Sequence, residues 1–291
     1  MRVMSLIKSI LLLVVVACLL APFTFLKPAL QDKVVVTEVK KVVKKEPKPV
    51  VKKVVEKPLH QVNLPDFAAI RDVKAKKQQF FDFLRPSVER ENAKLLTLRA
   101  NLESWLEKKS LGLSLSDEEL QTLTILVKRY RVNKKASVLQ QVNDLLVKVD
   151  IVPTALVLVQ AANESAWGTS RFSRIGLNFF GIWCYREGCG MIPSGRNKGA
   201  KHEVEAFQSV DEAVARYFYN LNSNNAYRVL RTIRFELRSQ SQPINPEILA
   251  TGLLPYSERG ADYVIEITKM LRHNQVYLKS NDVSTEPSIA E

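Results

Sequence analysis

One carboxylate in this sequence stands in a setting that favours acid chemistry. Glu164 follows the run 155–162, which is almost entirely apolar. A helix of this composition has no polar face on which an acid is solvated, and burial of an unpaired carboxylate raises its pKa. A carboxylic acid that keeps its proton near neutral pH can protonate the leaving-group oxygen of a glycoside. The spacing leaves one alternative open, a helix-end Glu that reaches solvent or caps a neighbouring group.

The residues around and after Glu164 form several motifs in order. Glu-Ser-Ala-Trp-Gly-Thr-Ser occupies 164–170, Asn-Phe-Phe-Gly-Ile occupies 178–182, and His-Glu-Val-Glu-Ala-Phe-Gln-Ser occupies 202–209. From about residue 145 to about residue 280 the sequence resembles the glucosaminidase family of bacterial cell-wall hydrolases (glycoside hydrolase family 73), and most closely its Bax-like bacterial branch. Phe179 stands where the family usually has Leu.

The resemblance implies roles for named residues. Glu164 corresponds to the family's general acid. A second carboxylate is expected from a small β-hairpin excursion within residues 176–207, where Glu203 is preferred and Glu187 and Glu205 are further candidates. The alternative for Glu203 is an exposed Glu without a catalytic role. Tyr227 closes an Asn-x-x-Tyr motif like that of the family. This tyrosine is expected to steady the oxocarbenium-like charge of the transition state or to position water.

Four further residues near the acid are candidates for contacting sugar. Trp167, Phe180 and Trp183 offer aromatic faces on which sugar rings can stack, and Asn178 belongs to the same motifs. Burial in the core is the ordinary explanation for at least one of these aromatic residues. No cofactor and no metal is expected, because the sequence has no Gly-rich phosphate loop and no His pair at ligand spacing.

Three functions fit these residues. The first is hydrolysis of peptidoglycan by an endo- or exo-acting β-N-acetylglucosaminidase. The second is a lytic transglycosylase on the same fold, which needs one acid/base Glu and no activated water. The third is a non-enzymatic cell-wall-binding protein that has kept the cleft and lost turnover. The expected partner in all three is the glycan strand of peptidoglycan.

Charge adds little to this choice. The chain has 43 Lys and Arg against 30 Asp and Glu, a formal net charge of +13. Nine Lys and three Glu lie between Lys33 and Pro58, so +6 of the total belongs to one stretch. No nucleic-acid partner is expected, because no recognition motif accompanies the charge. Attraction to an anionic wall polymer or membrane surface fits, and so does simple solubility.

The N-terminus predicts export. Arg2 and Lys8 precede the apolar run 10–26, which is at the short limit for a spanning helix and longer than a typical signal-peptide core. The first interpretation is an uncleaved signal anchor in the inner membrane. Cleavage near Ala21 and lipidation of Cys18 are the alternatives. Each of the three places the rest of the chain in the periplasm or another extracytoplasmic space.

Export affects the interpretation of the cysteines. Cys184 and Cys189 are the cysteine pair of the exported portion and enclose a short loop that contains Gly188. In an oxidising compartment this spacing favours a disulfide. A metal site is the alternative and needs further ligands, for which the sequence has three His.

Composition and hydrophobic spacing divide the chain into parts. We expect a signal anchor or signal peptide over 1–27, a Lys/Val/Pro-rich linker over 28–60, a helical region packing on the catalytic part over 61–148, the glucosaminidase domain over 149–279 and a disordered tail over 280–291. Capping boxes at 116–119 and 209–212 mark two helix starts. The predicted fold is mainly α, with a lysozyme-like helical catalytic domain, a small β-hairpin excursion and a preceding helical region.

Overall fold

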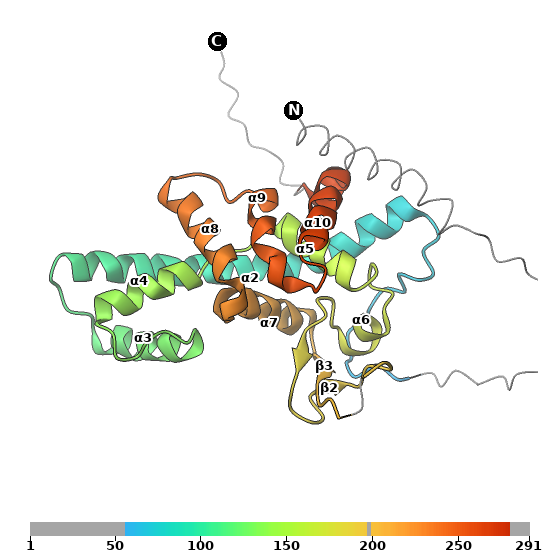
Figure 1. Cartoon of the computed structure of the whole chain (residues 1–291), viewed down its shortest axis with the longest axis horizontal. Coiled ribbons are helices and arrows are strands. Elements are labelled where there is room, and N and C mark those ends of the chain that lie inside the picture. Colours follow the sequence, from blue (N-terminus) through green and yellow to red (C-terminus); the bar gives the residue numbers. More distant parts are fainter. Residues whose placement is uncertain (1–55, 197–198, 280–291) are drawn as a thin grey trace, which may run out of the picture. The chain divides into compact units, whose positions relative to one another are not determined.

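The computed structural model describes residues 56–196 and 199–279 of the chain (Figure 1). The predicted signal segment 1–27 and the predicted tail 280–291 lie outside the described residues, as does most of the linker. Within the described ranges, no helix combines the length and the apolar composition that crossing a membrane requires.

The first labelled helix, α2, runs without interruption through Val73–Ser110. Asp72 caps its first turn by accepting a hydrogen bond from the backbone N–H of Ala75. Pro86 lies inside the helix, where a proline removes one backbone hydrogen bond. Buried side chains on both sides of this proline, from Phe80 to Trp105, give α2 a packed face along most of its length. Tertiary packing therefore offsets the local cost of the proline.

Two shorter helices follow, α3 (Asp117–Arg129) and α4 (Val138–Lys148), of which α4 lies beside α2 (Figure 1). α4 contacts both α2 and α3. The predicted capping box opens α3: the Ser116 hydroxyl accepts the N–H of Glu119, and the Glu119 carboxylate accepts the N–H of Ser116. This local pattern is sufficient to define the start of α3.

The helix that carries Glu164, α5 (Thr154–Glu164), lies among other helices (Figure 1). It contacts α2, and also α9 (Pro246–Ala250), α10 (Ala261–His273) and α11 (Gln275–Leu278). The side chains from Leu156 to Ala162 are all buried, as the apolar run predicts. Glu164 is the last helical residue, because the chain then turns away from the helix axis.

The turn after α5 has a left-handed backbone at three successive residues, Ala166, Trp167 and Gly168, with φ of 50°, 58° and 75°. The sequence predicts a helix that continues to Gly168, and the structure ends it at Glu164 instead. A Cβ atom on Gly168 would lie 2.5 Å from the ring of Phe67. The glycine is therefore needed both for its backbone conformation and for the close approach of this ring.

The remaining helices follow in chain order: α6 (Arg171–Gly176), α7 (Val210–Ser223), α8 (Arg228–Ser239) and the 3₁₀ turns η1 (Asn225–Tyr227) and η2 (Thr251–Tyr256). Ser209 caps α7 by accepting the N–H of Glu212. The Glu212 carboxylate accepts the N–H of Gln208, one residue before the position that a capping box predicts.

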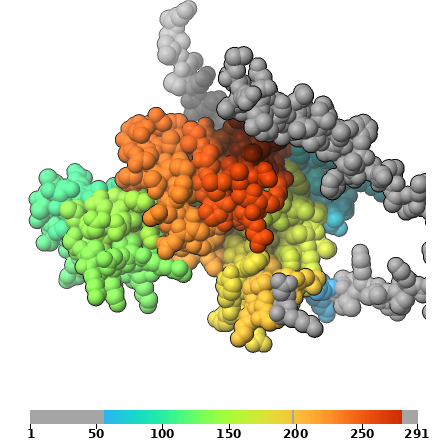
Figure 2. All heavy atoms as spheres, viewed as in Figure 1, coloured from blue at the N-terminus to red at the C-terminus, as the bar shows by residue number. Residues whose placement is uncertain are grey.

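The β excursion is a sheet of three short strands, β1 (Trp183–Cys184), β2 (Gly190–Met191) and β3 (Glu203–Glu205). β3 lies in the middle and pairs antiparallel with both neighbours, so that Val204 is opposite Trp183 on one side and Met191 on the other. The predicted hairpin thus has a third strand. In Figure 2 these residues (yellow) project from the helical body. The mainly α, lysozyme-like fold with a small β excursion is confirmed.

One hydrophobic core extends through the predicted helical region and the predicted catalytic domain. It joins Phe80 and Leu95 of α2 to Leu156 of α5, Tyr217 of α7 and Ile267 of α10. α2 contacts α5 and α7 directly. The long helix is therefore one wall of the body that holds the site.

Three arginines surround the segment between α4 and α5. Asp150 in this segment is 2% exposed, and its Oδ2 lies 3.4 Å from Arg99 Nη1, 3.9 Å from Arg234 Nε and closer still to Arg238 Nε. Arg99 and Arg234 also donate to backbone carbonyls at the end of α4 and just after it, which include those of Leu146, Lys148, Val149 and Ile151. These bonds satisfy acceptors that a helix end leaves unpaired, and they hold the chain where α5 begins.

Candidate active site

An open groove of about 1150 Å³ passes the end of α5, and we call it the Glu164 groove. Glu164 lies in its lining with Gly181 and Trp183 from the segment after α6. Tyr227 of η1 and Tyr256 of η2 also line it. Parts of the chain far apart in sequence thus surround one carboxyl group.

The Glu164 carboxyl is mostly removed from water. Burial, the largest effect, raises the pKa of Glu164 above its usual value, and the nearby charge of Glu266 adds to this. Hydrogen bonds with Tyr263 and Asn163 act in the opposite direction, as does the positive charge of Arg259. The net effect favours the protonated acid, the form that donates to a leaving group.

A buried amide positions the tyrosine that contacts the acid. The Nε2 of Gln160 donates to Tyr263 Oη over 2.9 Å, and its Oε1 accepts from the hydroxyl of Tyr217. Because Tyr263 Oη accepts the amide N–H, its own hydroxyl proton is available to Glu164, and the interaction with Tyr263 lowers the pKa of Glu164. The chain Tyr217, Gln160, Tyr263, Glu164 therefore orients the acid from the interior.

Gly181 keeps space open beside the acid. Its φ is +65°, and a Cβ atom at this position would lie 3.5 Å from Glu164 Oε2. A side chain here would be strained in its backbone and would occupy room in front of the carboxyl group. The geometry of the site thus explains why the Asn-Phe-Phe-Gly-Ile motif has Gly at this position.

Two tyrosines line the groove near Glu164. Tyr227 is 7% exposed, and burial raises its pKa to about 12, so its hydroxyl keeps its proton and remains a hydrogen-bond donor at neutral pH. Tyr256 donates to the carbonyl of Phe180 over 2.8 Å and stacks on Tyr263. The structure brings Tyr227 to the same groove as Glu164, where its predicted role requires it to lie.

The exposed aromatic residues of the groove lie on and beside β1. Trp183 is 49% exposed, and one face of its indole stacks on His202 with ring centroids 4.3 Å apart. Tyr185, which no sequence motif marks, is 75% exposed and lines the groove as well. An indole with one covered face and substantial exposure is suited to stacking on a sugar ring.

The structure does not bring Trp167 to the Glu164 groove. Its ring packs on Phe80 and Phe81, with centroids 5.7 and 5.2 Å away, and it lines a different hollow. The left-handed turn after α5 directs it there. Spacing along a regular helix does not predict this turn.

Asn178 and Phe180 hold the wall of the groove. Asn178 is 2% exposed; its Nδ2 donates to the carbonyls of Ile182 and Glu205, and its Oδ1 accepts the N–H groups of Phe180 and Ile182. Phe180 lines the groove but is 1% exposed, and its ring stacks on Tyr217. Both residues therefore have structural partners in the protein.

Glu203 is turned toward its own loop. Its carboxylate oxygens accept the N–H groups of Gly188 and Gly190 at 3.1 and 2.9 Å, and these two bonds lower the pKa of Glu203. Glu203 is 5% exposed and is not among the described residues that line the Glu164 groove. This geometry suits an ionised anchor of the loop between β1 and β2.

Two other carboxylates lie closer to the groove. Glu205 binds Arg216, which lines the groove, through Nε over 3.1 Å, and burial raises the pKa of Glu205. Glu258 lines the groove itself. The sequence does not mark Glu258, because this exposed residue belongs to no motif and no periodic face.

The predicted disulfide between Cys184 and Cys189 is confirmed, with Cα atoms 6.3 Å apart. The two sulfurs lie within 4.8 Å of a carboxylate oxygen of Glu203. Because the sulfurs are bonded to each other, they offer no thiolate to a metal ion. The disulfide and the Glu203 anchor act on the same loop, and Cys184 itself lines the Glu164 groove.

Gln160 and Tyr263 are two further residues of the candidate site that the motifs did not indicate. Gln160 is the one polar residue in the apolar run 155–162, four positions before Glu164. Residues four apart lie on the same face of a helix, so the spacing indicates that Gln160 lies near Glu164. Nothing near Tyr263 in the sequence marks its contact with the acid.

Replacing Glu203 by Gln is expected to loosen the β1–β2 loop. The pKa of Glu203 is lowered in the folded protein, so its contribution to stability is present above the pKa of the unfolded chain and is lost as the pH falls through the folded value. At neutral pH the Gly188 and Gly190 amides should therefore exchange hydrogen faster in the variant. Glu187→Gln, in the same loop, is the matched control and should leave both rates unchanged. Unaltered exchange in Glu203→Gln would contradict the anchoring role.

Comparison with known proteins agrees with this site. Residues 139–275 match the model of the glucosaminidase family, described as mannosyl-glycoprotein endo-β-N-acetylglucosaminidase. The chain belongs to this family of glycosidases, as its motifs predict. It is similar to Protein bax of Escherichia coli (strain K12), with 33% identity over 214 residues that cover 73% of this chain and 75% of the relative. No solved structure matches it significantly.

Proposed function

We propose that this protein hydrolyses the glycan strand of peptidoglycan as a β-N-acetylglucosaminidase, with Glu164 as the general acid. The observation that carries the proposal is a carboxyl group whose pKa is raised by burial and which lines an open groove with aromatic walls. Membership of the glucosaminidase family supports the same chemistry. The β-linkage and the peptidoglycan substrate are the finer parts of the proposal.

In the proposed reaction, protonated Glu164 gives its proton to the glycosidic oxygen. The bond between this oxygen and the anomeric carbon breaks, and the electron pair leaves with the oxygen. Positive charge develops on the remaining sugar, close to the hydroxyl of Tyr227. Water then adds to the anomeric carbon and releases a proton to solvent, and the Glu164 carboxylate takes up a proton from solvent, which restores the acid. Tyr263, held by Gln160, orients the acid during this cycle.

The position of Glu203 favours one alternative, lytic transglycosylation. A hydrolase of this kind usually has a second carboxylate that acts on water or on the sugar. Glu203 instead accepts two backbone N–H groups of its own loop. A transglycosylase needs one acid/base Glu only, because the 6-hydroxyl of the muramic acid attacks in place of water.

We further propose that the enzyme acts outside the cytoplasm, attached to the inner membrane through its N-terminal segment. The disulfide between Cys184 and Cys189 supports an oxidising compartment. The anchor itself lies outside the described residues, so it is supported only by the apolar run 10–26.

Digestion of purified peptidoglycan sacculi with the full chain tests the proposal, and mass spectrometry of the products identifies the bond that is cut. Products with N-acetylglucosamine at the reducing end are expected. Anhydro-muramic ends would show transglycosylation instead. Absence of released fragments would contradict both enzymatic functions and leave a wall-binding protein.

A further inference from the structure

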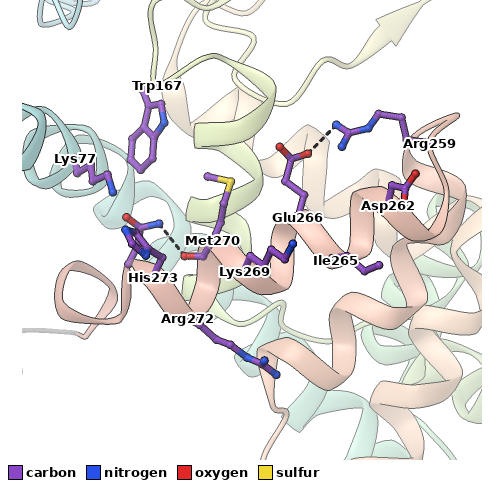
Figure 3. A pocket seen from close by; sticks show the side chains of 11 residues that line it. Lys77, Trp167, Arg259, Asp262, Ile265, Glu266, Lys269, Met270, Arg272 and His273 are labelled. Atoms are coloured by element: carbon purple, nitrogen blue, oxygen red, sulfur yellow. Dashed lines mark hydrogen bonds and ion pairs between the residues drawn. The ribbon is translucent and has the colours of Figure 1, made fainter.

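A second hollow adjoins the Glu164 groove, and we call it the Lys269 pocket (Figure 3). It has a volume of about 1030 Å³ and lies against one side of α10. Trp167, from the turn after α5, and Lys77 of α2 line it opposite side chains of α10 such as Met270 (Figure 3). Arg259 lines both the pocket and the Glu164 groove, so the two hollows are neighbours.

Positive side chains predominate in the Lys269 pocket. Its described lining includes four Lys and Arg side chains and two acidic ones, namely Lys77, Arg259, Lys269 and Arg272 against Asp262 and Glu266. Both arginines are already paired. Arg259 lies 2.7 Å from Glu266, and Arg272 lies 2.7 Å from Glu247. Among the described residues, Lys77 and Lys269 form no ion pair. Two ammonium groups are therefore available to an anion.

Besides His273 and Asn274, the rest of the lining is apolar or aromatic, namely Trp167, Ile265 and Met270. The ammonium of Lys77 lies 5.5 Å from the ring centroid of Trp167 and 5.9 Å from that of Tyr277. A cation held over aromatic rings can still donate hydrogen bonds away from them. Met270 and the half-exposed Ile265 add apolar surface beside it. The pocket thus combines cations with surfaces that suit small aliphatic side chains.

We propose that the Lys269 pocket binds the short acidic peptide that branches from the glycan strand. This inference rests on the proposed function, which places the glycan in the neighbouring groove. In peptidoglycan every second sugar carries a short peptide of small residues with free carboxylates. Such a peptide offers anions to Lys77 and Lys269 and aliphatic groups to Met270. Its branch point lies on the strand that the Glu164 groove would hold, and Arg259 lies where groove and pocket meet.

The test compares two substrates that differ only in the peptide. Solubilised glycan strands are used as isolated and after an amidase has removed their peptides, and kcat/KM of the full chain is measured on both. The wild type is expected to prefer the peptide-bearing strands. Lys269→Glu should reduce that preference about tenfold, because a charge-assisted contact becomes a repulsion. Lys135→Glu, an exposed residue on the loop between α3 and α4 with the same charge change, should retain the wild-type preference.

A binding measurement separates this inference from the proposed function. Calorimetric titration of the full chain with the peptides released by the amidase should give saturable binding that Lys269→Glu weakens and Lys135→Glu does not. If the wild type cuts neither substrate but still binds these peptides at Lys269, the proposed function fails and the pocket assignment stands. If it cuts both substrates equally well and the peptides do not bind, the pocket assignment is wrong and the proposed function stands.

Discussion

Replacing Glu164 by Gln is expected to reduce the rate of glycan cleavage by about 10²- to 10⁴-fold, the range for loss of a general acid. Gln has nearly the same shape but no proton to give to the glycosidic oxygen. The measurement is product release from sacculi at equal concentrations of folded protein. Glu118→Gln, at an exposed position of α3, makes the same chemical change outside the groove and should keep the wild-type rate. A Glu164→Gln variant with full activity would overturn the assignment of the acid.

The same substitution should change stability in a pH-dependent way. Burial raises the pKa of Glu164 in the folded protein. Below the unfolded pKa, near 4.5, the group is protonated in both the folded and the unfolded protein, and its full contribution to the free energy of unfolding is present. It is lost as the pH rises through the folded value, because the buried group must then ionise. Gln does not ionise.

The melting temperature of Glu164→Gln relative to the wild type should therefore increase as the pH is raised from 4 to 8. Thermal unfolding followed by circular dichroism at a series of pH values measures this difference. A constant or shrinking difference would mean that the carboxyl is not buried in the way described. The prediction is independent of any assumption about the substrate.

The largest loss of stability is expected for Asp150→Ala. This buried carboxylate pairs with Arg238 and lies beside Arg99 and Arg234. The Arg234 side chain is 1% exposed, and burial lowers its pKa to about 10. Removing one partner of a buried ion pair typically costs about 3–5 kcal/mol, because the other charge stays buried without compensation.

Urea denaturation at neutral pH measures this cost as the change in the free energy of unfolding. Asp211→Ala is the comparison, since the ion pair of Asp211 with Arg90 has about half of each side chain exposed. Exposed pairs contribute about 0–1 kcal/mol. If both variants lose similar stability, the arginine cluster does not hold the segment before α5 as we infer.

Local patterns predicted the parts of this protein that depend on neighbouring residues. The apolar run 155–162 predicted a buried helix, and the capping box at 116–119 predicted where α3 begins. The spacing of Cys184 and Cys189 predicted their disulfide. In each case the interacting groups lie within a few residues, so their types and spacing are sufficient.

Other features depend on residues that meet only after the chain has folded. Gln160 reaches Tyr263 across 103 positions and Tyr217 across 57, and no periodicity relates them. The direction of Trp167 depends on a left-handed turn packed against Phe67. The sequence placed the acid on its helix with its family motifs around it. The tertiary structure decided which side chains contact that acid, because each of those contacts depends on packing between elements far apart in the chain.

Glu203, the predicted second carboxylate, shows most clearly which features local sequence predicts and which depend on the tertiary structure. The sequence placed Glu203 on a strand of the β excursion, and the structure has a strand there. Which way its carboxylate points depends on pairing with β1 and β2, and this pairing aims it at the N–H groups of Gly188 and Gly190. Residue type and motif order therefore determined the family of this protein and indicated Glu164 as its candidate acid. The register of a three-stranded sheet decided the position of Glu203, because adjacent residues of a strand point to opposite faces.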